Sequence, residues 1–317
     1  MVTSGIPDVL VIGAGVAGLT TAVRLTEARL SVRVLAERPP LETTSAVAGA
    51  SWGPYLVSDP RVSHWSEQTR LTLEKIAEDP LSGVRLIRGT EASPRQVEPP
   101  LWVRGVSDFA PCLPAELPPG YVCGWRYTIP LVDMPRYLGY LTRRLAAAGV
   151  VVESGRVDSF DELRGAARVL VNCTGLGARR LVPDDQLFPT RGQLVIVDNP
   201  GIVSFFQDNA EQEELTYVLP HRDEVVLGGC ALLSESVEPD DATTEAILAR
   251  CVAIEPLLRH ATVRAVRVGL RPSRPRVRLG WADHDGVPVL HNYGHGGSGL
   301  TLSWGCADEV YNLCGLQ

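Results

Sequence analysis

The sequence lacks the features that mark disulfide-stapled, zinc-binding, membrane-spanning and nucleic-acid-binding proteins. Its seven cysteines are an odd number without a C-x-x-C pair, which argues against a disulfide framework and a zinc site and favours a reducing compartment. No apolar run is long enough to span a bilayer, and a formal charge of −7 disfavours nucleic acid and anionic membranes as partners. The opening MVTSGIP has no basic signal region and the closing CGLQ is no peroxisomal address, so we expect a cytoplasmic enzyme.

Length and hydrophobic patterning predict two interleaved domains. At 317 residues the chain is long for one core. Strand, helix and strand in succession form a βαβ unit, which requires a parallel sheet. The helices and short buried strands of this first pattern are expected at 8–12, 16–29, 31–35, 66–78, 133–148, 150–153 and 169–172. Residues 191–279 alternate as in an antiparallel sheet, with one helix at 243–254, whereas the proline-rich stretch 92–120 indicates irregular structure.

The predicted fold class is therefore α/β. A doubly wound domain of the Rossmann type, with a parallel sheet, is interleaved with a β-rich antiparallel domain.

A glycine-rich turn joins the first strand to the first helix. Gly13, Gly15 and Gly18 spell G-x-G-x-x-G between a strand and a helix, which is the context that a dinucleotide fingerprint requires. The first glycine permits the turn, the second lets the backbone approach a pyrophosphate, and the third lets helix and strand pack closely. Glu37, just after the second strand, lies where a carboxylate binds ribose hydroxyls and disfavours a 2′-phosphate. These residues predict NAD or FAD without separating the two.

A second glycine-rich turn lies almost a whole chain away. Four glycines fall within residues 294–299, and an apolar helical pattern follows them. Such a helix start offers free N–H groups and a positive dipole end to an anionic group.

Several stretches together strongly resemble the D-amino-acid oxidase family of flavoenzymes. They follow in order along nearly the whole chain: VIGAGVAGL, SWGPYLVSDP (51–60), VNCTGLGA (171–178), RGQ (191–193), GLRPSRPRVRL (269–279) and HNYGHGGSGLTLSWGCA (291–307). The resemblance, as to a bacterial member, implies non-covalent FAD in an extended pose and a D-amino acid stacked over the flavin. It further implies hydride transfer to flavin N5, reoxidation by oxygen to hydrogen peroxide, and hydrolysis of the imino acid to a 2-oxo acid and ammonia.

The same resemblance implies the site residues and the domain division. Arg271 would pair with the substrate carboxylate, Tyr217 would donate a hydrogen bond to it, and the carbonyl of Gly297 would face the amine. Residues at the cofactor would be Gly13, Ala14, Gly15, Val16, Gly18, Glu37, Arg38, Thr43, Thr44, Ser45, Gly49, Val157, Thr174, Gly175, Gly296, Gly297, Ser298, Gly299, Leu300 and Thr301. The FAD-binding domain would comprise 1–58, 134–190 and 280–317, and the substrate domain 59–133 and 191–279.

The residues themselves leave alternatives open. Arg271 shares odd parity with the apolar Val277 and Leu279, which suggests a buried arginine that needs an anion, but a solvated basic strand fits the pattern too. Tyr217 could equally be a core tyrosine. His291 and His295 are four apart but flank glycines in a loop, so we expect no metal.

The sequence also departs from the family pattern near the substrate. Gly53 stands where vertebrate members carry glutamine, Glu213 where they carry a lid tyrosine, and Ser298 where an aromatic is common. These changes predict a roomier side-chain pocket, and the acidic stretch with Asp208, Glu211, Glu213 and Glu214 disfavours acidic substrates.

Alternatives at this point are an oxidase of D-aspartate, glycine or a pathway-specific amine, an NAD-dependent dehydrogenase, and a flavin protein without turnover. The expected partners are a small D-amino acid and oxygen. The sequence is compatible with either a monomer or a homodimer.

Overall fold

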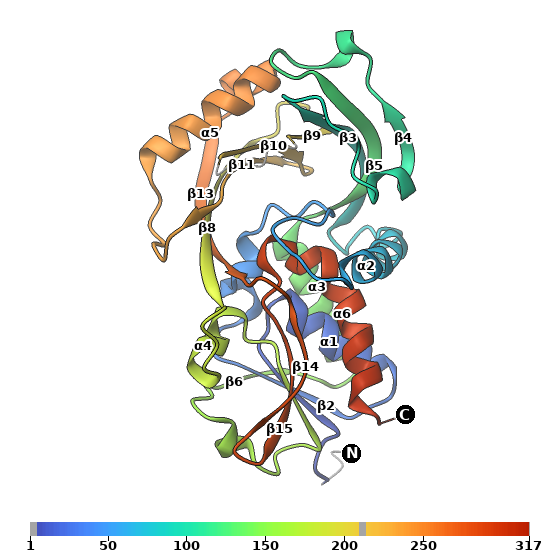
Figure 1. Ribbon diagram of the computed structural model, residues 1–317, viewed down its shortest axis with the longest axis vertical. Helices are drawn as coiled ribbons and strands as arrows, with labels where there is room; N and C mark the ends of the chain where they lie inside the picture. The colour runs from blue at the N-terminus through green and yellow to red at the C-terminus, as the bar shows by residue number, and fades with distance from the viewer. Residues whose placement is uncertain (1–4, 209–213, 317) are drawn as a thin grey trace.

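The computed structural model describes residues 5–208 and 214–316, which form two sheets, one above the other in Figure 1. The first sheet has the order β14-β15-β7-β1-β2-β6. Its strands are β1 (Val9–Ile12), β2 (Val32–Ala36), β6 (Val152–Ser154), β7 (Val169–Asn172), β14 (Arg278–His284) and β15 (Val287–Tyr293). All neighbours pair in parallel except β14, which forms an antiparallel hairpin with β15 at the edge.

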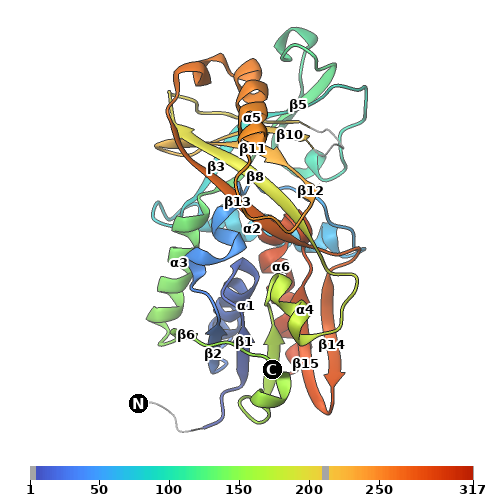
Figure 2. The ribbon, with the colours of Figure 1, turned by 90° about the vertical axis from the view of Figure 1, so that its left-hand side faces the viewer.

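Apolar helix faces cover one side of this sheet. Helices α1 (Val16–Glu27), α3 (Met134–Ala147) and α6 (Gly299–Cys314) lie side by side there, and α2 (Val62–Ile76) packs on α6 (Figure 2). The other side is covered by the short η5 (Phe160–Leu163) and α4 (Ala178–Leu181), whose apolar side chains pack on Leu10 and Leu170. Both faces of β1 are therefore buried, as its uninterrupted apolar run requires.

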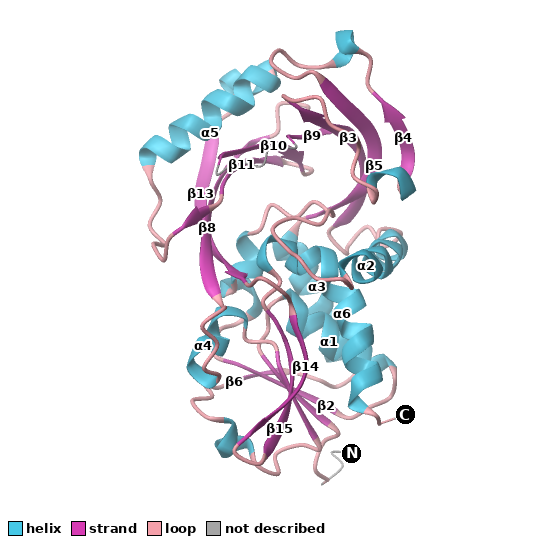
Figure 3. Cartoon of the chain, in the orientation of Figure 1, coloured by secondary structure: helices cyan, strands magenta, loops and turns pink. Residues whose placement is uncertain are grey.

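The second sheet curves over these helices (Figure 3). It contains β3 (Val84–Ser93), β4 (Ser107–Pro111), β5 (Cys123–Val132), β8 (Phe188–Asp198), β9 (Phe205–Asp208), β10 (Glu214–Pro220), β11 (Glu224–Cys230), β12 (Leu232–Leu233) and β13 (Val263–Ser273). The order is β12-β8-β11-β10-β9-β3-β5-β4, with β13 also paired to β8. Its pairs are antiparallel except β3 with β9. Helix α5 (Asp241–Ile254) covers the outer face through Ile247 and Cys251.

The predicted fold class is confirmed, with local differences. Strands β3 and β5 were not predicted, and β4 lies inside the stretch predicted to be irregular. Strand β4 is an edge strand that ends at Pro111, which is where a sheet tolerates proline. Strand β6 was predicted to be buried but is partly exposed, because it forms the edge of the first sheet. Within the described residues, no helix combines the length and the apolar character needed to cross a membrane.

Candidate active site

A cavity of about 800 Å³ begins at the carboxyl ends of the parallel strands and reaches the inner face of the second sheet. Ligands of open α/β sheets bind at this end of the strands. Most of the predicted site residues line it: Gly13, Ala14, Gly15, Val16, Glu37, Arg38, Thr43, Thr44, Ser45, Gly49, Val157, Thr174, Gly175, Tyr217, Arg271, Gly296, Gly297, Gly299, Leu300 and Thr301. Gly18 and Ser298 lie behind this lining.

The first glycine turn owes its shape to two contacts that leave no room for a side chain. Gly13 has a φ of +110°, and a Cβ there would lie 2.5 Å from the carbonyl oxygen of Cys173. A Cβ on Gly18 would lie 2.0 Å from the carbonyl oxygen of Gly13. Gly18 therefore acts on the cavity indirectly, because it lets α1 approach the turn.

The start of α1 points its N–H groups at the cavity. The N-cap residue Gly15 provides no side-chain cap, and the N–H of Val16 donates to the hydroxyl of Ser45 at 2.9 Å. Ser45 is thereby fixed beside the first turn of the helix, where an anionic group is stabilised by the dipole.

The start of α6 lines the same cavity next to the start of α1, since a Cβ on Gly299 would lie 3.8 Å from Cγ1 of Val16. Gly299, Leu300 and Thr301 border the cavity, and Ser298 at the N-cap makes no side-chain cap. The hydroxyl of Ser298 instead accepts from the N–H of Tyr55 at 2.6 Å and donates to its carbonyl at 2.7 Å. Ser298 thus positions the segment before it rather than contacting the cavity. One elongated cavity therefore receives two helix starts, as a cofactor with two anionic regions requires.

Glu37 lies at the end of β2, on the cavity wall and partly exposed. Its Oε2 accepts from Nη2 of Arg180 at 2.5 Å, and Arg156 lies 3.9 Å from Oε1. The hydrogen bond from Arg180 lowers the pKa of the Glu37 carboxyl, so the group is ionised at neutral pH.

We expect Glu37→Ala to weaken FAD binding by about 1–3 kcal/mol, because Glu37 is predicted to accept charge-assisted hydrogen bonds from the ribose hydroxyls. Titration of apoprotein with FAD, followed by flavin fluorescence, measures the dissociation constant. Glu153→Ala, which removes a carboxylate paired with Arg33 outside the cavity, is the matched control. An unchanged constant for Glu37→Ala would remove this residue from the cofactor site.

Arg271 brings a positive charge to the cavity, and the described part of the chain supplies no counter-charge for it. Its Nη1 donates to the carbonyls of Cys230 at 2.9 Å and Arg191 at 3.3 Å. Among the described residues it takes part in no ion pair. Gly192 makes room for it, since a Cβ there would lie 2.5 Å from Nη2. A partly buried guanidinium in this state needs an anion from the ligand.

Tyr217 approaches the same segment of β11 from β10. A Cβ on Gly228 would lie 1.8 Å from Cζ of its ring, and one on Gly229 would lie 2.9 Å from its hydroxyl. Burial raises the pKa of Tyr217 to about 12, so the hydroxyl keeps its proton and can donate it in a hydrogen bond. The ring packs at the edge of the core and also lines the cavity. Its position is therefore compatible with both predicted alternatives, a core tyrosine and a tyrosine that binds substrate.

Tyr55, Gly192 and Gly228 are residues of the candidate site that the sequence pattern did not predict individually. The guanidinium carbon of Arg271 lies 5.9 Å from the centroid of the Tyr55 ring, and a Cβ on Gly297 would lie 2.5 Å from Cδ1 of that ring. Tyr55 and Gly192 lie in stretches that resemble the family, and this resemblance is the signal that could have found them. Their individual roles depend on side chains from distant strands.

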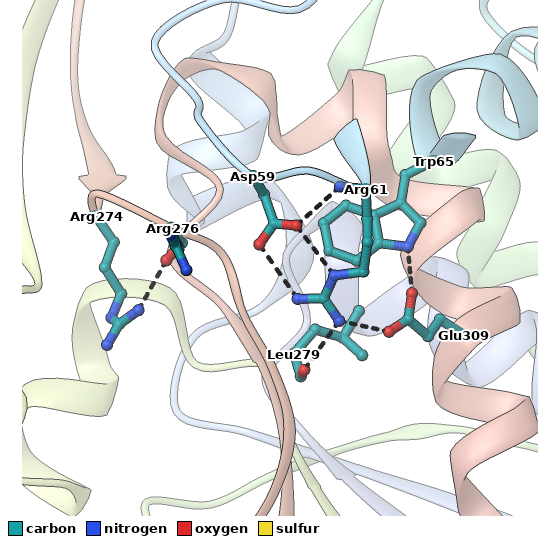
Figure 4. Close-up of polar contacts among 7 residues, drawn as sticks. All are labelled: Asp59, Arg61, Trp65, Arg274, Arg276, Leu279 and Glu309. Atoms are coloured by element: carbon teal, nitrogen blue, oxygen red, sulfur yellow. Dashed lines mark hydrogen bonds and ion pairs between the residues drawn. The ribbon is translucent and has the colours of Figure 1, made fainter. Parts of the chain in front are cut away.

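The other arginines near Arg271 have different partners. Nε of Arg274 lies 3.0 Å from Oδ2 of Asp184, and Nη1 of Arg274 donates to the carbonyl of Arg276. Arg276 itself is exposed and lies beside Asp59 of the Asp59–Arg61–Glu309 cluster (Figure 4). Arg271, Val277 and Leu279 do not share one strand face, contrary to the parity expected from the sequence. Strand β13 ends at Ser273 and β14 begins at Arg278 in the other sheet, so no single strand connects Arg271 with Leu279.

His291 lies in strand β15 rather than in the predicted loop, and His295 lies in the second glycine turn; the two rings belong to separate hydrogen-bond networks. His291 contacts Asn172 at 3.2 Å and His284 at 2.9 Å, whereas His295 contacts Asn292 at 3.0 Å. Burial lowers the pKa of His295 to about 4, so its ring is neutral.

Of the residues behind the predicted roomier pocket, Gly53 lines the cavity, whereas Ser298 is buried and does not line it. A Cβ on Gly53 would lie 3.5 Å from the indole of Trp102, so this indole occupies space next to the glycine. Ser298 is buried beneath Tyr55. Of the acidic stretch, Asp208 lines the cavity and Glu214 pairs with Arg250 at 3.3 Å, while Glu211 and Glu213 lie outside the described residues.

Comparison with known proteins identifies the family. The profile of a family described as FAD dependent oxidoreductase (DAO) matches residues 8–313. The chain belongs to this family of FAD-dependent oxidoreductases. The D-amino-acid oxidase of Rubrobacter xylanophilus is 48% identical over 96% of this chain and 95% of its own, and human D-aspartate oxidase is 35% identical over 96% and 94%. The crystal structure of glycine oxidase from Geobacillus kaustophilus aligns with a TM-score of 0.81 at 18% identity, covering 97% of this chain and 94% of that one.

FAD, the cofactor of this FAD-dependent family, fits the cavity. The Gly13–Gly18 turn with the start of α1 suits the pyrophosphate, Glu37 suits the ribose, and the start of α6 suits an anionic flavin ring. The resemblance inferred from the sequence motifs is confirmed.

Proposed function

We propose that the protein is a D-amino-acid oxidase that converts D-amino acids and oxygen to 2-oxo acids, ammonia and hydrogen peroxide. The observation that carries the proposal is the guanidinium of Arg271, which lines the cofactor cavity near Tyr217 and has no counter-charge among the described residues. The names of the most similar relatives support amino acids as substrates.

Each of the three predicted catalytic groups has a distinct task in this proposal. Arg271 holds the substrate carboxylate with two parallel hydrogen bonds, and Tyr217 donates a third. The carbonyl oxygen of Gly297 accepts from the amine. When bound, FAD would supply the hydride acceptor for the α-hydrogen and the route by which the electrons reach oxygen. The fixed orientation of the α-carbon, rather than a protein nucleophile, accelerates the reaction.

The alternatives differ in substrate. Oxidation of D-aspartate or glycine is suggested by the names of one relative and one solved structure. Asp208 and Glu91 on the cavity wall disfavour an acidic side chain, because they offer it no positive partner and would place further carboxyl groups beside it in a desolvated site. An NAD-dependent dehydrogenase is no longer an alternative, since the family depends on FAD.

The remaining expectations belong to the same proposal. Residues 1–58, 134–190 and 280–317 would hold FAD, and 59–133 and 191–279 would hold the substrate. In support, the first sheet draws its strands from 9–36, 152–172 and 278–293. The proposal also includes a cytoplasmic location and non-covalent binding of FAD. The protein would be either a monomer or a homodimer.

The experiment is an anaerobic absorbance titration with paired D- and L-amino acids. We expect the purified protein to be yellow, and D-alanine but not L-alanine to bleach the flavin absorbance. Denaturation should release the flavin, since it is held non-covalently. A preparation that neither contains FAD nor binds added FAD would contradict the cofactor assignment, and bleaching by the L-enantiomer alone would contradict the stereochemistry.

A further inference from the structure

A second ionisable side chain lines the cavity without a counter-charge from the described residues, and its ionised form has the charge opposite to that of Arg271. Glu91 of β3 is only 4% exposed, yet borders the cavity. Its Oε2 accepts from the hydroxyl of Tyr127 and from Nε2 of Gln207 at 3.2 Å. From the residues that the structure describes, Oε1 accepts no hydrogen bond, and no lysine or arginine among them pairs with this carboxylate.

Strand register places Glu91 on the same wall as the carboxylate anchor. Glu91 is paired with Gln207 between β3 and β9, and Gln207 is paired with Tyr217 between β9 and β10. Directly paired residues on neighbouring strands point to the same face of a sheet. Glu91 and Tyr217 are therefore separated by two strand spacings, or ~9–10 Å between their backbones. A ligand held at Tyr217 can extend along this row toward Glu91.

The surroundings of Glu91 favour a cation. Trp102 lines the cavity and packs edge-on against Trp52 and Tyr127, with ring centroids 5.4 and 6.0 Å apart. Asp208, at the end of β9, adds a second carboxylate to the wall. Aromatic side chains and a carboxylate that border the same desolvated site together attract an ammonium or guanidinium group.

We propose that Glu91 selects basic D-amino acids, by accepting a hydrogen bond from the side-chain cation of a substrate such as D-lysine while Arg271 holds its α-carboxylate. The inference rests on the proposed function and adds the substrate class. Burial raises the pKa of the Glu91 carboxyl, and an incoming cation restores its charged form. Arg271 and Glu91 then each gain the counter-charge that the described residues do not supply.

The test compares D-lysine with D-norleucine, which has the same chain without the charge, and with D-alanine. We expect wild-type protein to prefer D-lysine over D-norleucine in kcat/KM. Glu91→Gln should lower kcat/KM for D-lysine about 10- to 100-fold, mainly through KM, since a hydrogen bond between charged groups is lost. D-norleucine and D-alanine should change by less than about threefold, since neither reaches Glu91 with a charge.

Glu116→Gln is the matched control, because Glu116 is a surface carboxylate of the same sheet region, paired with Arg126. It should leave the D-lysine preference intact. FAD content and thermal unfolding of both variants show whether they fold. If Glu91→Gln lowers all three substrates equally, or if wild-type protein shows no preference for D-lysine, Glu91 is structural and the inference is overturned. Wild-type protein that reduces its flavin with none of the three would instead contradict the proposed function itself.

Discussion

Replacing Arg271 with leucine is expected to lower kcat/KM for D-amino acids by about 3–5 kcal/mol, because the substrate carboxylate becomes buried without a partner. The guanidinium also orients the α-carbon, so a loss in the rate of flavin reduction should accompany the loss in affinity. FAD content should stay at the wild-type level, since the hydrogen bonds of Arg271 go to the carbonyls of Cys230 and Arg191.

The conservative variant separates charge from geometry. Arg271→Lys keeps the positive charge but cannot make two parallel hydrogen bonds, so its kcat/KM should fall between those of wild type and Arg271→Leu. Arg276→Leu removes an exposed arginine from the neighbouring stretch and should behave as wild type. Stopped-flow flavin reduction against D-alanine concentration gives the rates, and absorbance gives bound FAD. Near-wild-type reduction by Arg271→Leu would mean that another group holds the substrate carboxylate.

The cofactor half of the site could largely be predicted, because its contacts join residues that are close in sequence. The G-x-G-x-x-G turn works through contacts between residues a few positions apart, such as Gly18 against Gly13. The parallel strand before it and the helix after it follow from short-range hydrophobic patterns. The second glycine turn could be recognised in the same way, although its side-chain contacts with Tyr55 could not.

The substrate half depends on pairings between distant segments. Glu91, Gln207 and Tyr217 form one row only because β3 pairs in parallel with β9, more than a hundred residues later, and β9 with β10. No local pattern indicates such a pairing, and nothing in the sequence around Glu91 distinguishes it from other charged residues. The same holds for Gly192, whose role is to leave space for Arg271 from another strand. The sequence therefore predicted the carboxylate anchor by resemblance and missed the wall that surrounds it.

Gly18 gives the sharpest test of how the fold builds the cofactor site. A methyl group at this position would approach the carbonyl oxygen of Gly13 to 2.0 Å and its carbon to 2.9 Å. Both are backbone atoms, so no side chain can move aside, and α1 must shift away from the turn. The shift should cost about 1–3 kcal/mol of folding stability, as overpacking does in other cores.

The larger effect of Gly18→Ala should be on the cofactor. Gly18 does not line the cavity, but displacement of α1 moves the N–H groups that face the pyrophosphate, and we expect FAD affinity to fall at least about tenfold. Flavin absorbance of the purified variant and FAD titration of its apoprotein measure the loss, with circular dichroism as the test of folding. Gly139→Ala in α3 is the control, because its Cβ would meet only the end of the Arg143 side chain, at 3.4 Å. A folded Gly18→Ala protein that binds FAD as tightly as Gly139→Ala would show that the distance between α1 and the Gly13 turn does not determine cofactor binding.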